Sequence, residues 1–314
     1  MWRNRFVRPL FRLNASLRAS PLARISAYRW LRRYGRRLLF RALSSDNGVL
    51  VDVAGQPLFI HAATEYVEEY VCHAYEPYTL ELFKSSIKPG AVVLDIGANI
   101  GYFALVAGKG VGPEGIVYAF EPAPENFALL ARNVDRFGTS NIIAVQKAVA
   151  ERRKTVSFLL AENNELNSFF RHPHGPVKEA IMVDCVTIDE YLEGRQVQVI
   201  KMDIEGYEPW ALEGMRETIS HSDDLVLFTE LHPPCLQTAG FTPGDYVMAL
   251  RQAGFEVRLV DENSKSLKPV ELDMIPAPER NPLWFANLYC VKKGGSGDQI
   301  RRAVGDVDSL PMGG

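Results

Sequence analysis

The sequence predicts a doubly wound α/β fold, in which a mostly parallel sheet carries helices on both faces. Several short runs, among them "GIVYAFE" at 115–121 and "VQVIKMDIEG" at 197–206, are largely apolar instead of alternating, as expected for strands buried on both faces. Such runs alternate with segments of helical periodicity, for example "PENFALLARNVDRFG" at 124–138. That alternation requires a parallel sheet covered by helices.

The expected elements follow in order from residue 49. A hairpin is predicted over 49–62, and helical sequence with a break at Pro77 over 65–87. Further strands are expected at 91–96, 115–121, 141–150, 155–162, 197–206, 224–232, 255–262 and 283–293, helices at 101–109, 124–138 and 242–254, and a strand followed by a helix over 182–192. Because no helix of convincing length separates the last two strands, we expect them to pair antiparallel as an edge of the sheet.

The chain divides into three predicted parts. Residues 1–45 form a basic amphipathic N-terminal arm, and residues 46–292 form the main domain. Within that domain, 46–90 are a hairpin and helical lid and 91–292 are the core. Residues 293–314 have the composition of a disordered tail.

The arm carries the basic character of the chain. Residues 1–45 contain twelve Arg and no Lys, Asp or Glu, so they hold a charge of +12; since the net charge is −3, the remainder holds −15. Helical periodicity over 22–38 separates an apolar face of Ala27, Leu31, Tyr34 and Leu38 from a face of Arg29, Arg32, Arg33 and Arg36.

Three roles for the arm stay open. Residues 22–41 can lie on an anionic membrane surface, act as an Arg-rich transit peptide, or dock on the domain itself. We expect a cytoplasmic protein, peripheral at the cytoplasmic membrane face in the first case. The acidic remainder argues against a nucleic-acid partner, and no run reaches the roughly 18 apolar residues of a membrane span.

The four cysteines indicate reduced, buried thiols. Cys72, Cys185, Cys235 and Cys290 are widely spaced, with no CxxC pair and no His at zinc-finger spacing. The spacing therefore predicts neither a disulfide framework nor a zinc site, and we expect no metal.

A glycine turn follows the strand at 91–96. Gly97 and Gly101 allow a tight turn and close approach of a ligand, and the helix after them offers free N–H donors. The pattern is not the dinucleotide fingerprint GxGxxG, because position 99 is Asn. Asp95 stands where a pyrophosphate would meet a like charge, so a cationic group such as an ammonium is favoured instead.

Glu121 adds the second half of a ligand. It lies 24 residues after Gly97 at the end of the next strand, where one carboxylate can accept hydrogen bonds from both hydroxyls of a ribose. A ligand with an amine at one end and a ribose at the other describes S-adenosylmethionine.

An ordered set of motifs carries a family resemblance over residues 60–292. The segments "LDIGANIGYF", "YAFEPAPENF", "VTIDEYL", "IKMDIEGYE" and "FTELH" resemble those of class I S-adenosylmethionine-dependent methyltransferases, and among them the FkbM-type family. The resemblance implies a Rossmann-like sheet of strand order 3-2-1-4-5-7-6 whose last strand is antiparallel. The edge pair expected above agrees with that order.

The resemblance also implies cofactor contacts. Asp95, Gly97, Ala98, Asn99 and Gly101 would line the methionine part and Glu121 the ribose. The residues expected to flank the ribose and adenine, or to fold over the cofactor, are Phe120, Pro122, Lys147, Ala148 and Glu76. For Glu76, an exposed helix-breaking position is the alternative.

Candidate catalytic residues follow the next two strands. Asp203 and Glu205 follow the strand in "KMDIEGYE", and Glu230 and His232 end "FTELH". Lys201 is either part of the site or the partner of Asp203. Asp203 is also a candidate for the cofactor site. His232 suits a general base because it titrates near neutrality.

Two further alternatives concern this region. Asp203, Glu230 and His232 form an oxygen-rich candidate for a divalent ion, which no ligand spacing supports. His172 and His174 lie in an expected acceptor-side insertion, where a flexible polar loop is the simpler interpretation.

The predicted function is S-adenosylmethionine-dependent methyl transfer to a hydroxyl. Acceptors of the family include sugars, glycans, glycolipids and polyketide-like products, and this sequence does not select among them. The alternatives are an NAD-dependent oxidoreductase, which Asn99 disfavours, and a catalytically silent cofactor-binding or membrane scaffold module. Neither the acceptor nor the oligomeric state follows from the sequence.

Overall fold

A computed structural model describes residues 48–292, apart from 54, 62–69, 71–74, 137, 139 and 174. The basic arm at 1–45 and the tail at 293–314 lie outside the described residues, as does most of the helical sequence expected before Pro77. None of the helices in the described part of the chain is long and apolar enough to span a bilayer.

The core of the described region is a mixed sheet in the order β12-β11-β13-β10-β9-β3-β4-β5. The strands are β3 (Val92–Ile96), β4 (Ile116–Phe120), β5 (Ile142–Val145), β9 (Val199–Met202), β10 (Val226–Leu231), β11 (Phe255–Asp261), β12 (Ser266–Pro269) and β13 (Ala286–Lys292). Counted from β3, this is the predicted order 3-2-1-4-5-7-6 with one additional strand. The prediction of a Rossmann-like α/β fold is confirmed.

The last strand lies inside the sheet. β13 pairs antiparallel with β10 on one side and with β11 on the other, so the predicted antiparallel pairing is confirmed. The pair does not form the edge, however, because β12 adds antiparallel to β11 through a short turn. β12 has only the four residues "SLKP", and its side chains are partly or fully exposed. Its sequence therefore has neither the apolar run nor the alternation that predicts a strand.

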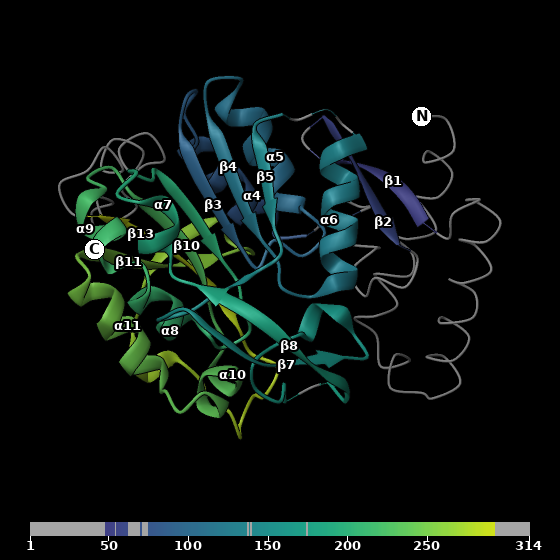
Figure 1. The fold of residues 1–314 in the computed structure, drawn as a ribbon. Coiled ribbons are helices and arrows are strands. Elements are labelled where there is room, and N and C mark those ends of the chain that lie inside the picture. Colours follow the sequence, from purple (N-terminus) through teal and green to yellow (C-terminus); the bar gives the residue numbers. More distant parts are fainter. Residues whose placement is uncertain are drawn as a thin grey trace.

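Two layers of helices cover the sheet (Figure 1). One core cluster joins the sheet to α4 (Pro77–Ser86), α5 (Tyr102–Val111) and α6 (Pro124–Arg136), and the other joins it to α7 (Ile188–Leu192), α8 (Glu208–Glu213), α9 (Arg216–His221), α10 (Pro233–Thr238) and α11 (Pro243–Gln252). Successive strand residues such as Val93 and Leu94 belong to opposite clusters, as the alternation of side chains along a strand requires.

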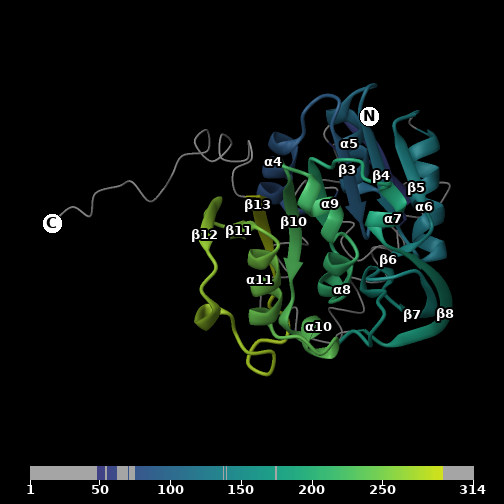
Figure 2. The ribbon, with the colours of Figure 1, turned by 60° about the vertical axis from the view of Figure 1, so that its left-hand side comes forward.

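A second sheet lies at the carboxyl ends of the parallel strands. It has the order β6-β8-β7, formed by β6 (Ala148–Val149), β7 (Lys154–Ala161) and β8 (Val177–Val186), with the short 3₁₀ helix η2 (Asn164–Leu166) in the β7–β8 connection. In Figure 2, β10 runs down toward α10, and the small sheet lies at that same lower end. The expected single strand at 141–150 is thus divided between two sheets.

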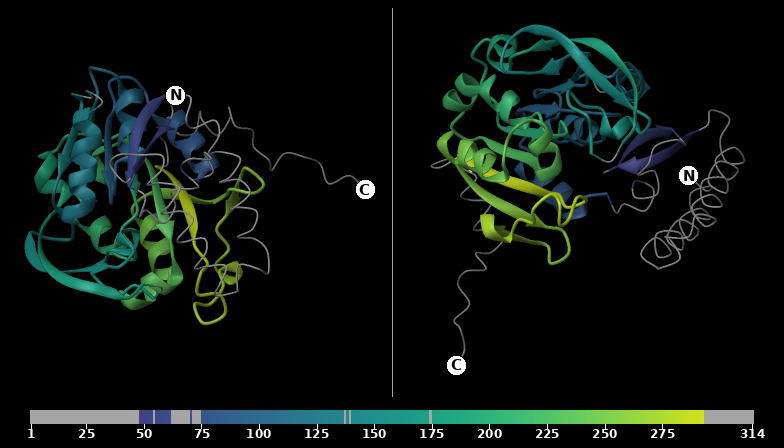
Figure 3. Two further views of the ribbon diagram at one scale, coloured as in Figure 1. Left: turned by 90° about the vertical axis from the view of Figure 1, so that its right-hand side faces the viewer. Right: turned by 90° about the horizontal axis from the view of Figure 1, so that it is seen from below.

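The N-terminal hairpin packs on the outside of one helical layer. β1 (Gly48–Val53) pairs antiparallel with β2 (Gln56–His61), and the hairpin contacts α5 and α6. The right-hand view of Figure 3 shows the hairpin, in purple, at the edge of the described ribbon. The hairpin prediction is confirmed. Helix α4 begins at Pro77, the predicted break, where the missing N–H of proline costs nothing.

The single-turn helices α8, α9 and α10 were not predicted. Each has six residues, which is too short for helical periodicity to be recognised. A further 3₁₀ helix, η3 (Leu272–Met274), follows β12.

Candidate active site

The glycine turn closes tightly between β3 and α5. Gly97, Asn99 and Gly101 have φ values of 84°, 49° and 94°, which is the left-handed region. The N–H groups of Gly97 and Ala98 both donate to the carbonyl of Phe120 at the end of β4. A Cβ on Gly97 would overlap the carbonyl oxygen of Asp203, so this glycine makes room for the backbone that follows β9.

Asp95 ends β3 as a buried carboxylate. Its side chain is 2% exposed, and Oδ2 has no hydrogen-bond partner among the described residues. Burial raises the pKa of Asp95 to about 7, against the opposing effects of Lys201 and of a hydrogen bond from the Ala104 backbone. A buried acceptor of this kind suits a cationic donor from a ligand.

Glu121 holds the glycine turn from the end of β4. Its Oε2 accepts the N–H of Asn99 at 2.9 Å, and its Oε1 accepts the N–H of Ala123 at 2.9 Å. Burial raises its pKa to about 7 although these hydrogen bonds oppose the shift. Each carboxylate oxygen keeps a second lone pair for a ligand hydroxyl.

The other predicted cofactor residues lie around this turn. Pro122 is partly exposed beside Glu121, Lys147 is partly exposed before β6, and Ala148 is buried in β6. The ring of Phe120 packs in the core, with its centre 5.1 Å from the centre of the Tyr191 ring. Phe120 therefore contacts the glycine turn through its backbone carbonyl, which accepts two N–H groups of that turn. Side-chain contacts of these residues with a cofactor stay a prediction.

Glu76 lies near the ends of β9 and β13. It precedes α4 in the left-handed region, with φ of 41°, and its Oε2 is buried. Burial raises its pKa, while Lys201 and a hydrogen bond from Asn287 oppose the shift. The alternative of an exposed Glu-Pro break is therefore wrong.

Lys201 pairs with Asp203, which is one of the two interpretations that the sequence left open. Its Nζ lies 3.1 Å from Oδ2 of Asp203 and 5.1 Å from the centre of the Phe103 ring. Although Lys201 is only 1% exposed, the carboxylates of Asp203 and Glu76 outweigh its burial and raise its pKa. The cation neutralises part of the charge that gathers at the ends of β9 and β10.

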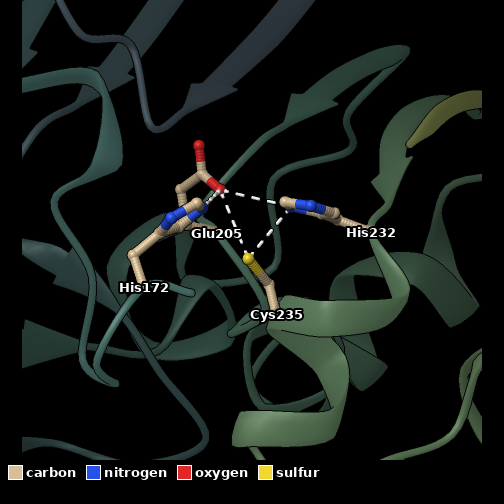
Figure 4. A group of neighbouring side chains, drawn as sticks. All are labelled: His172, Glu205, His232 and Cys235. Carbon is tan, nitrogen blue, oxygen red and sulfur yellow. Dashed lines mark hydrogen bonds and ion pairs between the residues drawn. The ribbon is translucent and has the colours of Figure 1, made fainter. Parts of the chain in front are cut away.

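Glu205 is at the centre of a mixed cluster (Figure 4). Its Oε2 lies 3.1 Å from Nε2 of His172, 3.7 Å from Nδ1 of His232 and 3.7 Å from Sγ of Cys235. A fourth distance of 2.9 Å joins Cys235 Sγ to His232 Nδ1. Against burial, the two imidazoles hold the pKa of Glu205 below its usual range.

The turn that carries Glu205 is held in place by close backbone packing. Glu205 and Gly206 both have positive φ, at 54° and 95°. A Cβ on Gly206 would lie 2.6 Å from the carbonyl oxygen of Cys235. In the same turn, Glu208 is 2% exposed and accepts the N–H of Ile204 at 2.9 Å.

Glu230 lies near the end of β10, and His232 follows the strand as the N-cap of α10. One side-chain oxygen of Glu230, Oε2, is buried without a hydrogen-bond partner among the described residues, 4.0 Å from Nδ1 of His232. Burial and then the charges of Asp203 and Glu205 raise the pKa of Glu230 well above its usual range. Carboxylate oxygens of Asp203, Glu205 and Glu230 all lie within 4.8 Å of one another.

Comparison with known proteins identifies the family. Residues 95–257, just over half of the chain, match the Methyltransferase FkbM domain. The chain belongs to the FkbM methyltransferase family. Membership in this family displaces the oxidoreductase alternative, and the protein is an S-adenosylmethionine-dependent methyltransferase.

Individual relatives of this FkbM methyltransferase are distant. The hexuronic acid methyltransferase AglP of Haloferax volcanii is 25% identical over 60% of this chain and 73% of its own length. The 31-O-demethyl-FK506 methyltransferase FkbM of Streptomyces tacrolimicus is 38% identical over 32% of this chain and 36% of its own. A solved methyltransferase FkbM from Methylobacillus flagellatus is 18% identical, covering 73% of this chain and 53% of that one with a TM-score of 0.41.

The site of this FkbM methyltransferase fits its cofactor. S-adenosylmethionine carries an ammonium and two ribose hydroxyls. The orphaned Oδ2 of Asp95 and the remaining lone pairs of Glu121 are acceptors for these groups at the ends of adjacent strands. When bound, the cofactor would supply an activated methyl group.

Sequence reasoning missed one residue of the FkbM methyltransferase site, Cys235, for which it predicts only a buried thiol. Glu208 is among the charged residues that it places at the end of "KMDIEGYE", without a separate role. For His172 the flexible-loop interpretation is wrong, because its side chain is 2% exposed against Glu205. His174 lies outside the described residues. The "HPP" before Cys235 was the one available signal, since Pro234 at the start of a helix places the cysteine in its first turn.

Proposed function

We propose that this FkbM-family methyltransferase methylates a hydroxyl group of a sugar, glycan, glycolipid or polyketide-like acceptor. The observation that carries the proposal is the carboxylate of Glu230, whose Oε2 is buried and lacks a hydrogen-bond partner in the described part of the chain. A hydroxyl must lose its proton as it is methylated, and a carboxylate beside the acceptor takes that proton.

The reaction balances with one proton acceptor. The bond from methyl carbon to sulfur breaks as the bond from methyl carbon to the acceptor oxygen forms. The hydroxyl proton passes to Glu230, and S-adenosylhomocysteine leaves. The protein mainly aligns the two reactants, because the leaving group is already good. His232 is the second candidate for the proton acceptor. Its Nδ1 is directed at Cys235 and Glu205, so it would take the proton through Nε2.

Aromatic side chains beside the cluster support a sugar-containing acceptor. Phe169 and Phe170 are half-buried in the loop that carries His172, and the ring centres of Phe169 and Tyr207 are 4.2 Å apart. Trp210 continues the group at 6.4 Å from Tyr207. Because Tyr207 is buried, only the partly exposed rings of Phe169, Phe170 and Trp210 could contact the C–H face of a sugar ring. The hexuronic acid named for the archaeal relative belongs to the same acceptor class.

A labelling experiment tests the proposal. Full-length protein is incubated with methyl-labelled S-adenosylmethionine and a native extract, and the glycan, lipid and small-molecule fractions are analysed by mass spectrometry. We expect a label that survives mild alkaline hydrolysis, because a methyl ether is stable to base. Label released as methanol would mean methylation of a carboxyl group, such as that of a uronic acid. S-adenosylhomocysteine binding without any labelled product would favour a catalytically silent protein.

The basic arm supports a location for this activity. Its charge of +12 and its segregated faces would hold an otherwise acidic protein on the cytoplasmic face of an anionic membrane. Lipid-linked or surface-destined acceptors are found at that face.

A further inference from the structure

A second role for the residues at the ends of β9 and β10 follows from the cluster in Figure 4. We propose that His172, Glu205, His232 and Cys235 bind one Zn²⁺ ion. The inference goes beyond methyl transfer, because such an ion would hold the acceptor side of the protein together whatever the acceptor is.

The donor atoms have the spacing of a tetrahedral site. Zinc bonds of about 2.0–2.3 Å give donor separations of about 3.3–3.8 Å in a tetrahedron. Four of the six separations among the donors are 2.9, 3.1, 3.7 and 3.7 Å. The other two, from His172 to His232 and to Cys235, are at most 4.8 Å, so an ion requires the His172 side chain to move inward by about 1 Å at most.

The donor types select zinc over magnesium or calcium. Two imidazole nitrogens and one sulfur accompany a single carboxylate oxygen, and such ligands suit Zn²⁺, whereas Mg²⁺ and Ca²⁺ take oxygen ligands. His172 binds through Nε2 and His232 through Nδ1. His172, His232 and Cys235 are 6%, 7% and 1% exposed, so water competes little for the ion.

Charge balance also favours a divalent cation. The carboxylate and a thiolate together carry two negative charges, which one Zn²⁺ neutralises while both imidazoles stay neutral. Binding displaces the thiol proton of Cys235 to the solvent, together with any proton on the two ligating nitrogens. The carboxylate of Asp203, which Lys201 neutralises only in part, lies within 4.8 Å of Glu205, so a cation at the cluster also offsets the charge that remains there.

The site would join three segments that are far apart in the chain. His172 lies in the loop between η2 and β8, Glu205 follows β9, and His232 with Cys235 begins α10. The loop already touches the turn after β9, since Ser168 donates to the carbonyl of Glu205 at 3.0 Å. Only His232 and Cys235 are close in the sequence, so the spacing shows at most half of a zinc site.

Metal titration of the full-length protein tests the site. Protein dialysed against a chelator is titrated with Zn²⁺ by calorimetry and with Co²⁺ by absorbance. We expect one equivalent of each ion, proton release on binding, and a thiolate-to-cobalt charge-transfer band in the near ultraviolet. Removal of zinc should lower the thermal midpoint, because the ion stabilises only the folded state.

A matched pair of cysteine variants identifies the ligand. Cys235→Ser should lose the charge-transfer band and bind zinc at least about a hundredfold more weakly, since even outer-shell changes cost 10–100-fold. Cys185→Ser, a buried thiol of β8 outside the cluster, should keep both. His172→Gln repeats the test should Cys235→Ser fail to fold, as judged by binding of S-adenosylhomocysteine.

Each negative outcome has one meaning. Absence of stoichiometric binding, or an unchanged cobalt band in Cys235→Ser, overturns the zinc site while cofactor binding and methyl transfer stand. A protein that binds zinc as described but labels no acceptor overturns the proposed function alone.

Discussion

Gly97 and the backbone carbonyl of Asp203 occupy one narrow space between the ends of β3 and β9. The N–H of Asp203 donates to the carbonyl of Ile96 at 3.0 Å, which draws the two chain segments together just where any Cβ on residue 97 would overlap the carbonyl oxygen. The glycine turn, where we expect the cofactor to bind, and the turn that carries Glu205 therefore depend on each other.

Replacing Gly97 should damage both turns. Gly97→Ala adds a steric overlap with backbone to the cost of about 1–2 kcal/mol for a left-handed alanine. Gly90→Ala is the matched control, because Gly90 has φ of 78° but nothing within 4 Å of its missing Cβ. We expect Gly90→Ala to show only the conformational cost in chemical denaturation and Gly97→Ala to lose clearly more, together with affinity for S-adenosylhomocysteine. Equal losses in the two variants would contradict the close approach.

Cofactor affinity should depend on pH through Asp95. The pKa of this carboxyl is raised to about 7, and its ionised form is the counter-charge of the ligand ammonium. Affinity for S-adenosylhomocysteine should therefore be full above pH 7 and fall by about tenfold per pH unit below it. Asp95→Asn should bind weakly with a shallower pH dependence, whereas Asp223→Asn, an exposed control, should behave as the parent protein. Calorimetric titration with S-adenosylhomocysteine above and below pH 7 measures these affinities. If the affinity of the parent protein did not change with pH, Asp95 would not be part of the cofactor site.

Turnover should depend on Glu230 more than cofactor affinity does. Glu230→Gln keeps the size of the side chain but cannot take the hydroxyl proton, so we expect a loss of about 10²–10⁴ in rate. Binding of S-adenosylhomocysteine should stay within a few fold of the parent protein. Glu217→Gln, exposed on α9, is the control. Normal turnover of Glu230→Gln would require another group at the ends of β9 and β10 to take the proton.

Deleting residues 1–45 should separate two roles of the arm. If the arm binds membranes, the truncated protein no longer sediments with anionic liposomes but still binds S-adenosylhomocysteine. Each basic residue near such a surface contributes about 1 kcal/mol at most, so sedimentation of the full-length protein should also fall with salt. A full-length protein that ignores liposomes at physiological salt, and a truncated one of lower thermal stability, would instead indicate docking on the domain.

The sheet order was accessible from sequence because it rests on local patterns. Buried strands such as β4 and β9 are almost wholly apolar, and the glycine turn after β3 is visible in Gly97 and Gly101. The pairing of Lys201 with Asp203 was one of two interpretations that their spacing left open, and the structure decides between them.

The cluster around Glu205 was not accessible in the same way. His172 and Cys235 meet Glu205 only after the β7–β8 connection folds across the strand ends, and these contacts join residues at least 30 positions apart. The sequence around His172 is a loop that contains Pro and a second His, and nothing in that local pattern predicts that the side chain is buried. The left-handed φ of Glu205, a non-glycine residue, likewise depends on the tertiary packing of Gly206 against Cys235.

The position of β13 has a consequence for synthesis of the protein. Residues 286–292 separate β10 from β11, so these two strands cannot share a continuous hydrogen-bonded sheet until the last strand has left the ribosome. Pairing over such sequence distances is slow and leaves strand edges exposed in the nascent chain. In a chain that stops at Phe285, we expect the amide hydrogens of β11 to exchange far faster than those of β3 and β4, whose partners are already made.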